Sequence, residues 1–464
     1  MILRLAVKSA ARNAPSWLAL IISSVTLAVV LTLNIALIIS GAAAEGEGRQ
    51  AFIAMGGTAL GFSLLTGLAS FVLVVSVCVR LQRRDVALWQ IAGLSPRSAF
   101  STVTIETLLL TLVSAALGAV LAVALWPAFA GFVSTSGLPQ SDVLNGRIPI
   151  AALIIGVAST AVVTCLAGVR SSRAIVNGDI VESVKSANTF EQNRPSVVRR
   201  IVSITLGVGA VIGVAAIYVA ISNADPVTEP RKIGEFLTTY SGMGMLLCLV
   251  FALFGGPAVR LVVWLGSRTL GRGLTPFLAT REASARPRLT RALIMPLSLA
   301  AASTGVMMTW VDKLRTVLTA ETGSTDGVSA PPEQIALLLG GPIIVACVAS
   351  GAIVFATATN RQQDNALLLV AGATSRLIYR KALGEALFYA VISLVCAYAI
   401  ICLNEVAMVQ ALSAGPIPNV GLAAPSWHAG AVIAFGVALA LIMLLVITVT
   451  GLRKHPISTI QEGH

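Results

Sequence analysis

Long apolar stretches divide the chain and restrict the folds that are open to it. Ten of them can cross a bilayer, since about 20 helical residues cover the roughly 30 Å hydrocarbon core. They lie near residues 16–41, 53–79, 102–133, 148–169, 201–222, 237–258, 292–311, 334–359, 382–404 and 428–452. With 56% hydrophobic and 11% charged residues, the chain has too little polar surface for a water-soluble protein of 464 residues. We therefore predict an all-α polytopic membrane protein with about ten transmembrane helices.

The basic residues set the orientation of these spans. If the N-terminus is cytoplasmic, 26 of the 32 Lys and Arg residues fall in cytoplasmic segments. Such an excess is the usual positive-inside bias, so the net charge of +12 does not require a nucleic acid partner. We therefore predict that both termini are cytoplasmic, which also requires an even number of spans.

A short cytoplasmic segment occurs twice in the chain. The first copy is DVALWQIAGLSPR at residues 85–97 and the second is DNALLLVAGATSR at residues 364–376. The two copies align without a gap when Asp85 is set against Asp364, and we call this register the repeat alignment. Each copy predicts a two-turn helix, at residues 85–93 and 364–372, which is too short to cross a bilayer.

The ends of both short helices carry residues typical of helix caps. Asp85 and Asp364 are expected at the N-cap or in the first turn, where an acid satisfies free N–H groups and the helix dipole. Gly93 and Gly372 are expected to end the helices in a left-handed C-terminal cap.

A short apolar helix that one chain presents twice to the cytoplasm suits docking to a two-fold partner. The alternative is a helical elbow that only turns the chain between two spans. The proposed contact residues are Asp85, Leu88, Trp89, Ile91, Ala92, Gly93 and Arg97 in the first copy, and Asp364, Leu367, Leu368, Val370, Ala371, Gly372 and Arg376 in the second.

The repeated segment belongs to a larger repeat, since the first four spans recur as the last four. A basic amphipathic segment opens each unit, at residues 5–11 and 278–284. We predict a unit at 1–186, a linker with spans five and six at 187–275, and a second unit at 276–464. Both units start in the cytoplasm, so the repeats are parallel and the architecture is 4 + 2 + 4.

Two acids also match in the repeat alignment, near the cytoplasmic ends of spans three and nine. An ionisable group at such a depth is costly unless it is paired or close to the interface. Glu106 and Glu385 are therefore expected to brace each short helix against its span, through Arg97 and Arg376. The alternative is interfacial snorkelling without a role in coupling.

Small residues and outer acids leave further alternatives open. Gly57 and Gly61 in span two, and Gly340 and Gly341 in span eight, allow close helix contact either between the two halves or within one half.

The acids of the outer loops, Glu405 among them, are expected to be solvated, and attraction of a cationic amphiphile is the alternative.

The ordered parts resemble a known family. A basic opening helix is followed by two spans, a short D-x-A-L-x-x-x-A-G helix with Arg four residues after its Gly, a span with Glu near its start, and another span. This set resembles the FtsX-like permease family of ABC transporters, with two units in one chain. Ten spans resemble the bacitracin-efflux type of antimicrobial-peptide transporter, but the large extracellular domain of that type is missing between spans seven and eight.

The resemblance implies the function. The short helices would be coupling helices that contact two copies of a separately encoded ABC ATPase, which holds ATP and Mg. The chain itself would have no catalytic residue, metal site or cofactor, and would lie in membrane lipid as a multi-pass subunit of a bacterial cell membrane. Its substrate would be an amphiphile, such as an antimicrobial peptide, a lipid or a hydrophobic drug, that is exported or extracted.

Two other function classes remain as alternatives. The same parts could pass ATP-driven motion to a sensor kinase or a cell-wall enzyme without moving a cargo. An ion-coupled secondary transporter would usually show charged residues near mid-membrane and inverted repeats, and neither is visible in the sequence.

Overall fold

The computed structural model describes residues 14–136, 144, 146–176, 197–223, 230–270, 274–322, 332–414, 421–422 and 427–453. The predicted opening segment at residues 5–11 lies outside this part of the chain. The described residues form thirteen helices and no strand. These helices are α2 (Ala14–Gly41), α3 (Gly46–Leu81), α4 (Arg83–Ile91), α5 (Pro96–Thr135), α6 (Ile150–Val176), α8 (Val197–Ser222), α9 (Pro230–Leu270), α10 (Leu274–Ala285), α11 (Pro287–Thr322), α12 (Pro332–Ala356), α13 (Ala358–Val370), α14 (Ser375–Ala414) and α15 (His428–Arg453).

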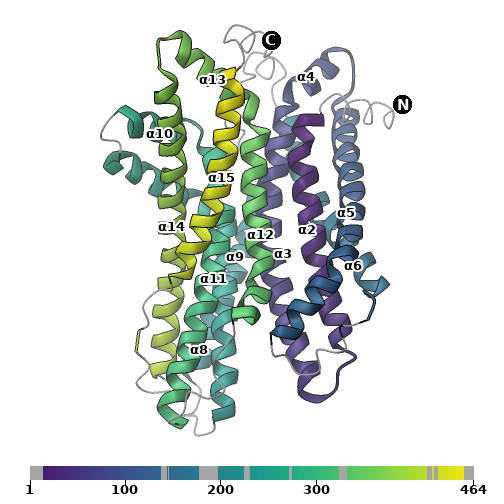
Figure 1. The fold of residues 1–464 in the computed structure, drawn as a ribbon, viewed down its shortest axis with the longest axis vertical. Coiled ribbons are helices and arrows are strands. Elements are labelled where there is room, and N and C mark those ends of the chain that lie inside the picture. The colour runs from purple at the N-terminus through teal and green to yellow at the C-terminus, as the bar shows by residue number, and fades with distance from the viewer. Residues whose placement is uncertain are drawn as a thin grey trace.

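The long helices confirm the prediction of an all-α polytopic membrane protein. Within the described ranges, nine helices are long and apolar enough to cross a membrane. The tenth predicted span corresponds to α15, a helix of 26 residues whose described apolar part is His428–Leu439. The long helices run side by side along the long axis, and α4 and α13 lie at the same end (Figure 1). The distribution of basic residues assigns this end to the cytoplasm.

The first and last four long helices pack in the same way. In the first group, α2 packs against α3, α5 and α6, and α6 also packs against α3 and α5. In the second group, α11 packs against α12, α14 and α15, and α15 also packs against α12 and α14. The helices α5 and α14 begin and end at matching positions of the repeat alignment, and each has 40 residues. This correspondence is what two copies of one unit would produce, while the boundaries at 186/187 and 275/276 stay a prediction.

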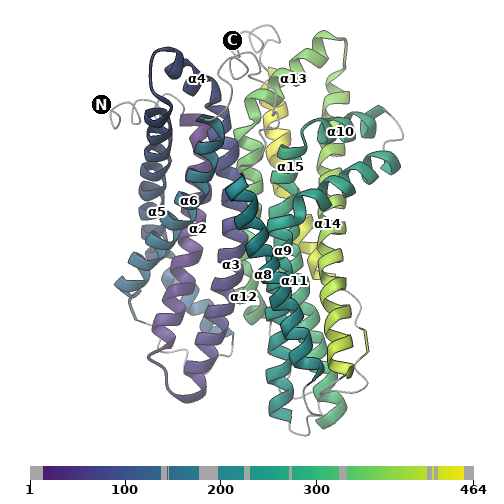
Figure 2. The same ribbon diagram turned by 180° about the vertical axis from the view of Figure 1, so that it is seen from behind.

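The linker helices pack mainly on the second group. The helix α9 lies against α11 and α14, and α8 lies against α9 and α14 (Figure 2). The short helix α10 continues this contact at the cytoplasmic end, because it packs against α9, α14 and α11. The chain is therefore less symmetric than its two groups of four helices.

The two groups meet along α12, which packs against both α2 and α3. The helices are in close contact at Gly341, where an added Cβ atom would lie 2.8 Å from Ser63 Oγ and 2.8 Å from Val30 Cγ1. Beside it, Asn34 Nδ2 donates a hydrogen bond of 3.2 Å to Ser63 Oγ. A small residue thus lets the helices approach where lipid offers no hydrophobic drive for association.

The four glycines named above do not share this role. A Cβ atom at Gly61 would meet Met245 of α9, while one at Gly57 or Gly340 would meet nothing within 4 Å. Contact between the two halves through a small residue is therefore found at Gly341.

The expectation that the outer acids are solvated is wrong for Glu405. This carboxylate is buried and lies 2.7 Å from the Nζ atom of Lys313, which is also buried. The Lys313 ammonium also donates to the carbonyl oxygen of Gly421. Pairing offsets part of the cost of burying the two charges, and it joins the outer parts of α11 and α14.

The glycine contact between the halves can be tested with two adjacent alanine variants. Gly341→Ala should lower the free energy of unfolding by about 1–3 kcal/mol, because its Cβ atom forces Ser63 or Val30 to move. Gly340→Ala should be neutral or stabilising, since its Cβ atom enters open space and glycine is unfavourable in a helix by roughly 0.5–1 kcal/mol. The measurement is unfolding by SDS titration in mixed micelles, and equal effects of the two variants would contradict this account.

Candidate docking site at the cytoplasmic end

The two predicted short helices are present, with different starting points. The helix α4 spans Arg83–Ile91, so Asp85 lies in its first turn as predicted. The helix α13 spans Ala358–Val370, so Asp364 lies in its middle, and its predicted place in the first turn is wrong. The reason is that α13 starts one turn earlier, after Thr357, which brings Asp364 against Arg286 instead of against free N–H groups.

The C-terminal ends of the two helices are identical in geometry. Gly93 and Gly372 adopt φ angles of 94° and 91°, which confirms the predicted left-handed caps. The Gly93 N–H donates to the Gln90 carbonyl and the Leu94 N–H to the Trp89 carbonyl. The second copy has the same pair of bonds from residues 372 and 373 to residues 369 and 368. This is the Schellman motif, which satisfies carbonyl groups that a helix end leaves free.

Matched positions on the two helices present apolar side chains to the outside. Leu88 and Leu367 are 47% and 57% exposed, and Ile91 and Val370 are 63% and 66% exposed. The members of each pair occupy the same position in the repeat alignment. Each helix thus has an apolar surface that is exposed to solvent at the cytoplasmic end. Exposed apolar surfaces of this kind are typical of a contact site for another protein.

The other predicted contact residues surround these side chains. Trp89 and Leu368 are half-buried, as are Asp85 and Asp364. The exposed residues are Ala92, Gly93, Arg97, Ala371, Gly372 and Arg376. The predicted sets therefore lie together on each helix and its C-terminal turn. Whether a partner contacts them stays a prediction.

Each short helix is joined directly to a long span. Ser95 caps the N-terminus of α5 by accepting a hydrogen bond of 3.2 Å from the Ser98 N–H, and Pro96 occupies the first helical position. In the second copy, α14 likewise starts three residues after Gly372. A force on either short helix would thus act on a span of 40 residues.

The matched acids are both buried, but the predicted brace through the arginines is wrong. Glu106 Oε1 accepts a hydrogen bond of 2.7 Å from Trp17 Nε1, on α2. Arg97 precedes Glu106 by nine residues on α5, which is about 13 Å along a helix axis, and its side chain is exposed. Arg376 is exposed in the same way, and Glu385 is bonded to a different arginine.

That arginine opens a network of charged residues in the second half. Arg361 NH1 of α13 lies 2.7 Å from Glu385 Oε2 of α14. The other Glu385 oxygen lies 3.7 Å from Lys381, one turn earlier. Lys381 in turn lies 2.5 Å from Glu282 of α10. The chain of contacts thus runs from the short helix through the span to α10.

The network returns to α13 through Arg286, in the link between α10 and α11. Arg286 NH2 lies 2.8 Å from Asp364 Oδ2 of α13, and NH1 lies 3.8 Å from Glu282. Three cations and three anions thus balance one another. Removal of one partner of a buried ion pair typically lowers the free energy of unfolding by about 3–5 kcal/mol, because the remaining charge is left uncompensated.

The two acids of this network that lie outside the spans have pKa shifts of opposite sign. Burial raises the pKa of Glu282, but the charges of Lys381 and Arg361 outweigh burial and lower it to about 2. Burial also raises the pKa of Asp364, and Arg286 opposes this shift. Glu282 is therefore ionised at any physiological pH, as an anion between two cations must be.

Sequence reasoning missed Arg361, Lys381, Glu282 and Arg286. One signal was available, because Lys381 and Glu385 stand four residues apart and so share a helix face. The contacts with α10 and α13 join residues that are far apart in the sequence, and no local pattern predicts them.

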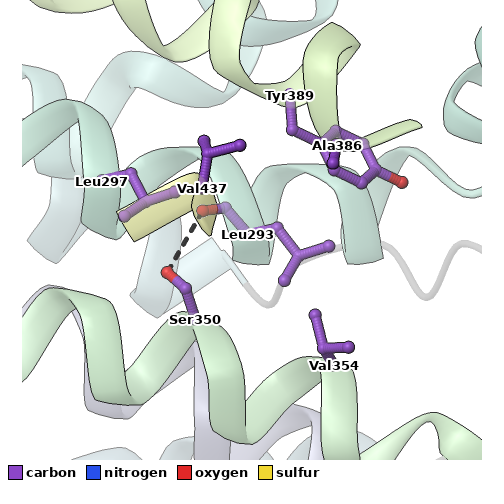
Figure 3. Close-up of a pocket in the computed structure, with 7 residues that line it drawn as sticks. All are labelled: Leu293, Leu297, Ser350, Val354, Ala386, Tyr389 and Val437. Carbon is purple, nitrogen blue, oxygen red and sulfur yellow. Dashed lines mark hydrogen bonds between the residues drawn. The ribbon is translucent and has the colours of Figure 1, made fainter. Parts of the chain in front are cut away.

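A small apolar hollow lies inside the second group of helices (Figure 3). Its lining residues are Leu293, Leu297, Ser350, Val354, Ala386, Tyr389 and Val437. Its cavity volume is about 10 Å³, which is close to the least that holds one water molecule and is far too small for a ligand. In the repeat alignment, Phe71 stands where this half has Ser350, and Phe71 is fully buried. The hollow therefore reflects a local difference in packing between the two halves, where a small serine replaces a large phenylalanine.

Comparison with protein families gives a match over part of this chain. Residues 57–180 match the family model described as FtsX-like permease C-terminal. The matched segment contains most of α3 and all of α4, α5 and α6, so it includes the first of the two short helices and Glu106. No curated protein is similar enough to count as a match.

The left-handed caps can be tested by substituting one glycine. Gly372→Ala should lower the thermal unfolding midpoint, because a left-handed conformation costs a residue with a Cβ atom about 1–2 kcal/mol. Gly57→Ala is the control, since Gly57 is in a right-handed helix with nothing within 4 Å of an added Cβ atom. If Gly372→Ala were as stable as Gly57→Ala, the cap would not hold the turn.

Proposed function

We propose that this chain is the membrane subunit of an ABC transporter, because residues 57–180 match the FtsX-like permease family, whose members are membrane subunits of ABC transporters and typically non-catalytic. We propose that α4 and α13 are coupling helices and that each docks one copy of a separately encoded ATPase. The ATPase binds ATP and Mg and supplies the energy. This chain converts the closing motion of the two copies into movement of its spans.

The observation that carries this proposal is the matched pair of exposed apolar surfaces. Leu88 and Ile91 on α4 have counterparts in Leu367 and Val370 on α13, all largely exposed at the same end of the molecule. Water-exposed apolar side chains are stabilised when a partner covers them. Two equal surfaces on one chain fit two equal partner subunits better than one.

The connection to the spans supports transmission of force. A left-handed glycine ends each docking helix and leads within three residues into a helix of 40 residues. Rigid helices transmit displacement along their length because their backbone hydrogen bonds fix the geometry. Movement of α4 and α13 would therefore displace α5 and α14.

The charge distribution favours an amphiphilic cargo that is exported or extracted from the membrane. Charged residues of the described spans lie toward the helix ends, as Glu106, Glu385, Lys313 and Glu405 do. A small ion would need charged or polar groups near mid-membrane. A peptide antibiotic, a lipid or a hydrophobic drug can instead keep its apolar part in hydrocarbon.

The docking proposal is tested by co-purification with the ATPase encoded nearest to this chain. Wild type should bring down two ATPase subunits, and the double variant Ile91→Glu, Val370→Glu should lose both. Each glutamate would be buried in an apolar contact without a partner for its charge. Because burying an unpaired charge is costly, binding should weaken by up to several orders of magnitude. Both positions are exposed in the chain alone, so the substitutions should leave its fold intact.

The matched control is Leu422→Glu. Leu422 is 67% exposed and lies between α14 and α15, at the end opposite to the docking helices. It should retain both ATPase copies. If the double variant also retained them, α4 and α13 would be elbows. If the ATPase bound and hydrolysed ATP but amphiphile transport into vesicles stayed at background, motion passed to a kinase or a cell-wall enzyme would replace transport.

A further inference from the structure

The last part of α9 runs along the membrane instead of leaving it. An added Cβ atom at Gly256 would meet the guanidinium of Arg291, at the cytoplasmic end of span seven. If α9 continued along its axis, the next ten residues would extend about 15 Å into the cytoplasm. However, a Cβ atom at Gly266 would lie 2.9 Å from Ile392 Cδ1 and 3.1 Å from Phe388 Cε2, in the cytoplasmic half of span nine. This part of α9 therefore crosses from α11 to α14 at the depth of the cytoplasmic leaflet.

The helix α10 forms a hairpin with this part of α9, and we call residues 258–270 and 274–285 together the lateral hairpin. Pro257 precedes it inside α9, and a proline permits a helix to change direction. The helix α10 packs against both α9 and α14, and its Glu282 binds Lys381, just before the start of span nine. Both views show α10 at the flank of the bundle, beside α14 (Figures 1 and 2). The lateral hairpin thus lies where headgroups and acyl chains of the cytoplasmic leaflet meet.

The two faces of this part of α9 differ in what they contact. Val259 and Val263 are buried against the bundle. On the other side, Leu261, Trp264 and Leu265 are exposed. They stand three and four residues apart, so they share one face of the helix. Apolar and tryptophan side chains that face outward at this depth contact lipid, as in helices that lie in the plane of a membrane interface.

Each helix of the lateral hairpin carries an aromatic residue followed one turn later by an arginine. The Cζ atom of Arg268 lies 4.2 Å from the centre of the Trp264 ring, and that of Arg281 lies 5.6 Å from the centre of the Phe277 ring. All four residues are exposed. A guanidinium that stacks on a ring is held in place, and the N–H groups at its edge can donate to a phosphate.

The charge of the lateral hairpin favours an anion. Residues 258–285 contain four arginines and one acid. The acid is Glu282, whose charge is taken up by Lys381 of α14. The outward face is therefore cationic, with apolar side chains directly beside the cations. A phospholipid with an anionic headgroup offers the complementary parts, since its phosphate lies at the membrane surface and its acyl chains lie beneath.

We propose that the lateral hairpin is a binding site for an anionic phospholipid of the cytoplasmic leaflet. Arg268 and Arg281 bind the headgroup, while Trp264 and its neighbouring leucines contact the acyl chains. Because both helices of the hairpin pack on α14, the bound lipid would hold this span at a fixed depth in the membrane. The site goes beyond the proposed function, and it needs no ATPase to be present.

Native mass spectrometry of the purified full chain in detergent micelles measures this binding, with phosphatidylglycerol and phosphatidylcholine as probes. Wild type should bind phosphatidylglycerol at least tenfold more tightly than phosphatidylcholine. The double variant Arg268→Gln, Arg281→Gln should weaken phosphatidylglycerol binding at least tenfold, because each arginine near an anionic surface contributes roughly fivefold in affinity. Its binding of phosphatidylcholine should stay unchanged, which separates a lost anion site from a lost fold.

The matched control is Arg49→Gln, which removes an exposed arginine near the outer end of α3. It should leave the affinity for phosphatidylglycerol unchanged. The proposal is overturned if wild type binds the two lipids equally, or if the Arg268→Gln, Arg281→Gln variant keeps the affinity of wild type. It is also overturned if Arg49→Gln weakens binding as much as that variant does.

The depth of the lateral hairpin is measured separately, by quenching of tryptophan fluorescence in vesicles of lipid brominated on the acyl chains. Trp264→Phe removes one of the six tryptophans. The fluorescence that this variant loses should be quenched more strongly than that of the remaining tryptophans, because Trp264 faces acyl chains. If it is quenched less strongly, the end of α9 lies outside the hydrocarbon. The exposed surface would then serve a protein partner, which overturns the proposal.

Discussion

Hydrocarbon cannot solvate a charge, and this constraint decides where the chain can place its ionic contacts. The long helices satisfy their own backbone groups, and their apolar side chains fill the space between them. Charged side chains lie toward the ends of the spans, where Lys313 pairs with Glu405 in the outer half and Arg361 pairs with Glu385 in the cytoplasmic half. The ionic contacts therefore join helices near the two faces of the membrane. At the cytoplasmic end, they join α13 to α14 and to Arg286, which follows α10.

The two halves agree in their packing and differ in their polar contacts. The helices of both groups of four contact one another in the same pairs, and α4 and α13 expose the same positions. Apolar packing tolerates exchange of side chains of similar size, so it preserves a shared geometry in both copies. A buried ion pair needs both partners, so Gln82 and Thr102, which stand where the second half has Arg361 and Lys381, cannot form the contacts that Arg361 and Lys381 make with Glu385. The linker helices α8 and α9 add to the difference, because they cover α11 and α14.

Much of the fold follows from the sequence, since each span is a local property of its own residues. The repeat alignment also predicts the matched docking helices and the glycine caps, which the φ angles of Gly93 and Gly372 confirm. The partners of Glu106 and Glu385 could not be found in this way. Trp17 and Arg361 reach these acids through packing of helices that are distant in the sequence, and the nearby Arg97 and Arg376 are exposed to solvent instead. Likewise, the role of Gly341 depends on which helix lies opposite, which a glycine pattern alone does not state.

The central claim is that one chain holds two ATPase subunits through α4 and α13. The most direct measurement combines native mass spectrometry of the complex with site-specific crosslinking from Leu88 and from Leu367. The account predicts one chain with two ATPase subunits, and crosslinks from both helices to the same surface on two different copies. A complex with a single ATPase copy, crosslinks from both helices to one copy, or no complex at all would contradict it.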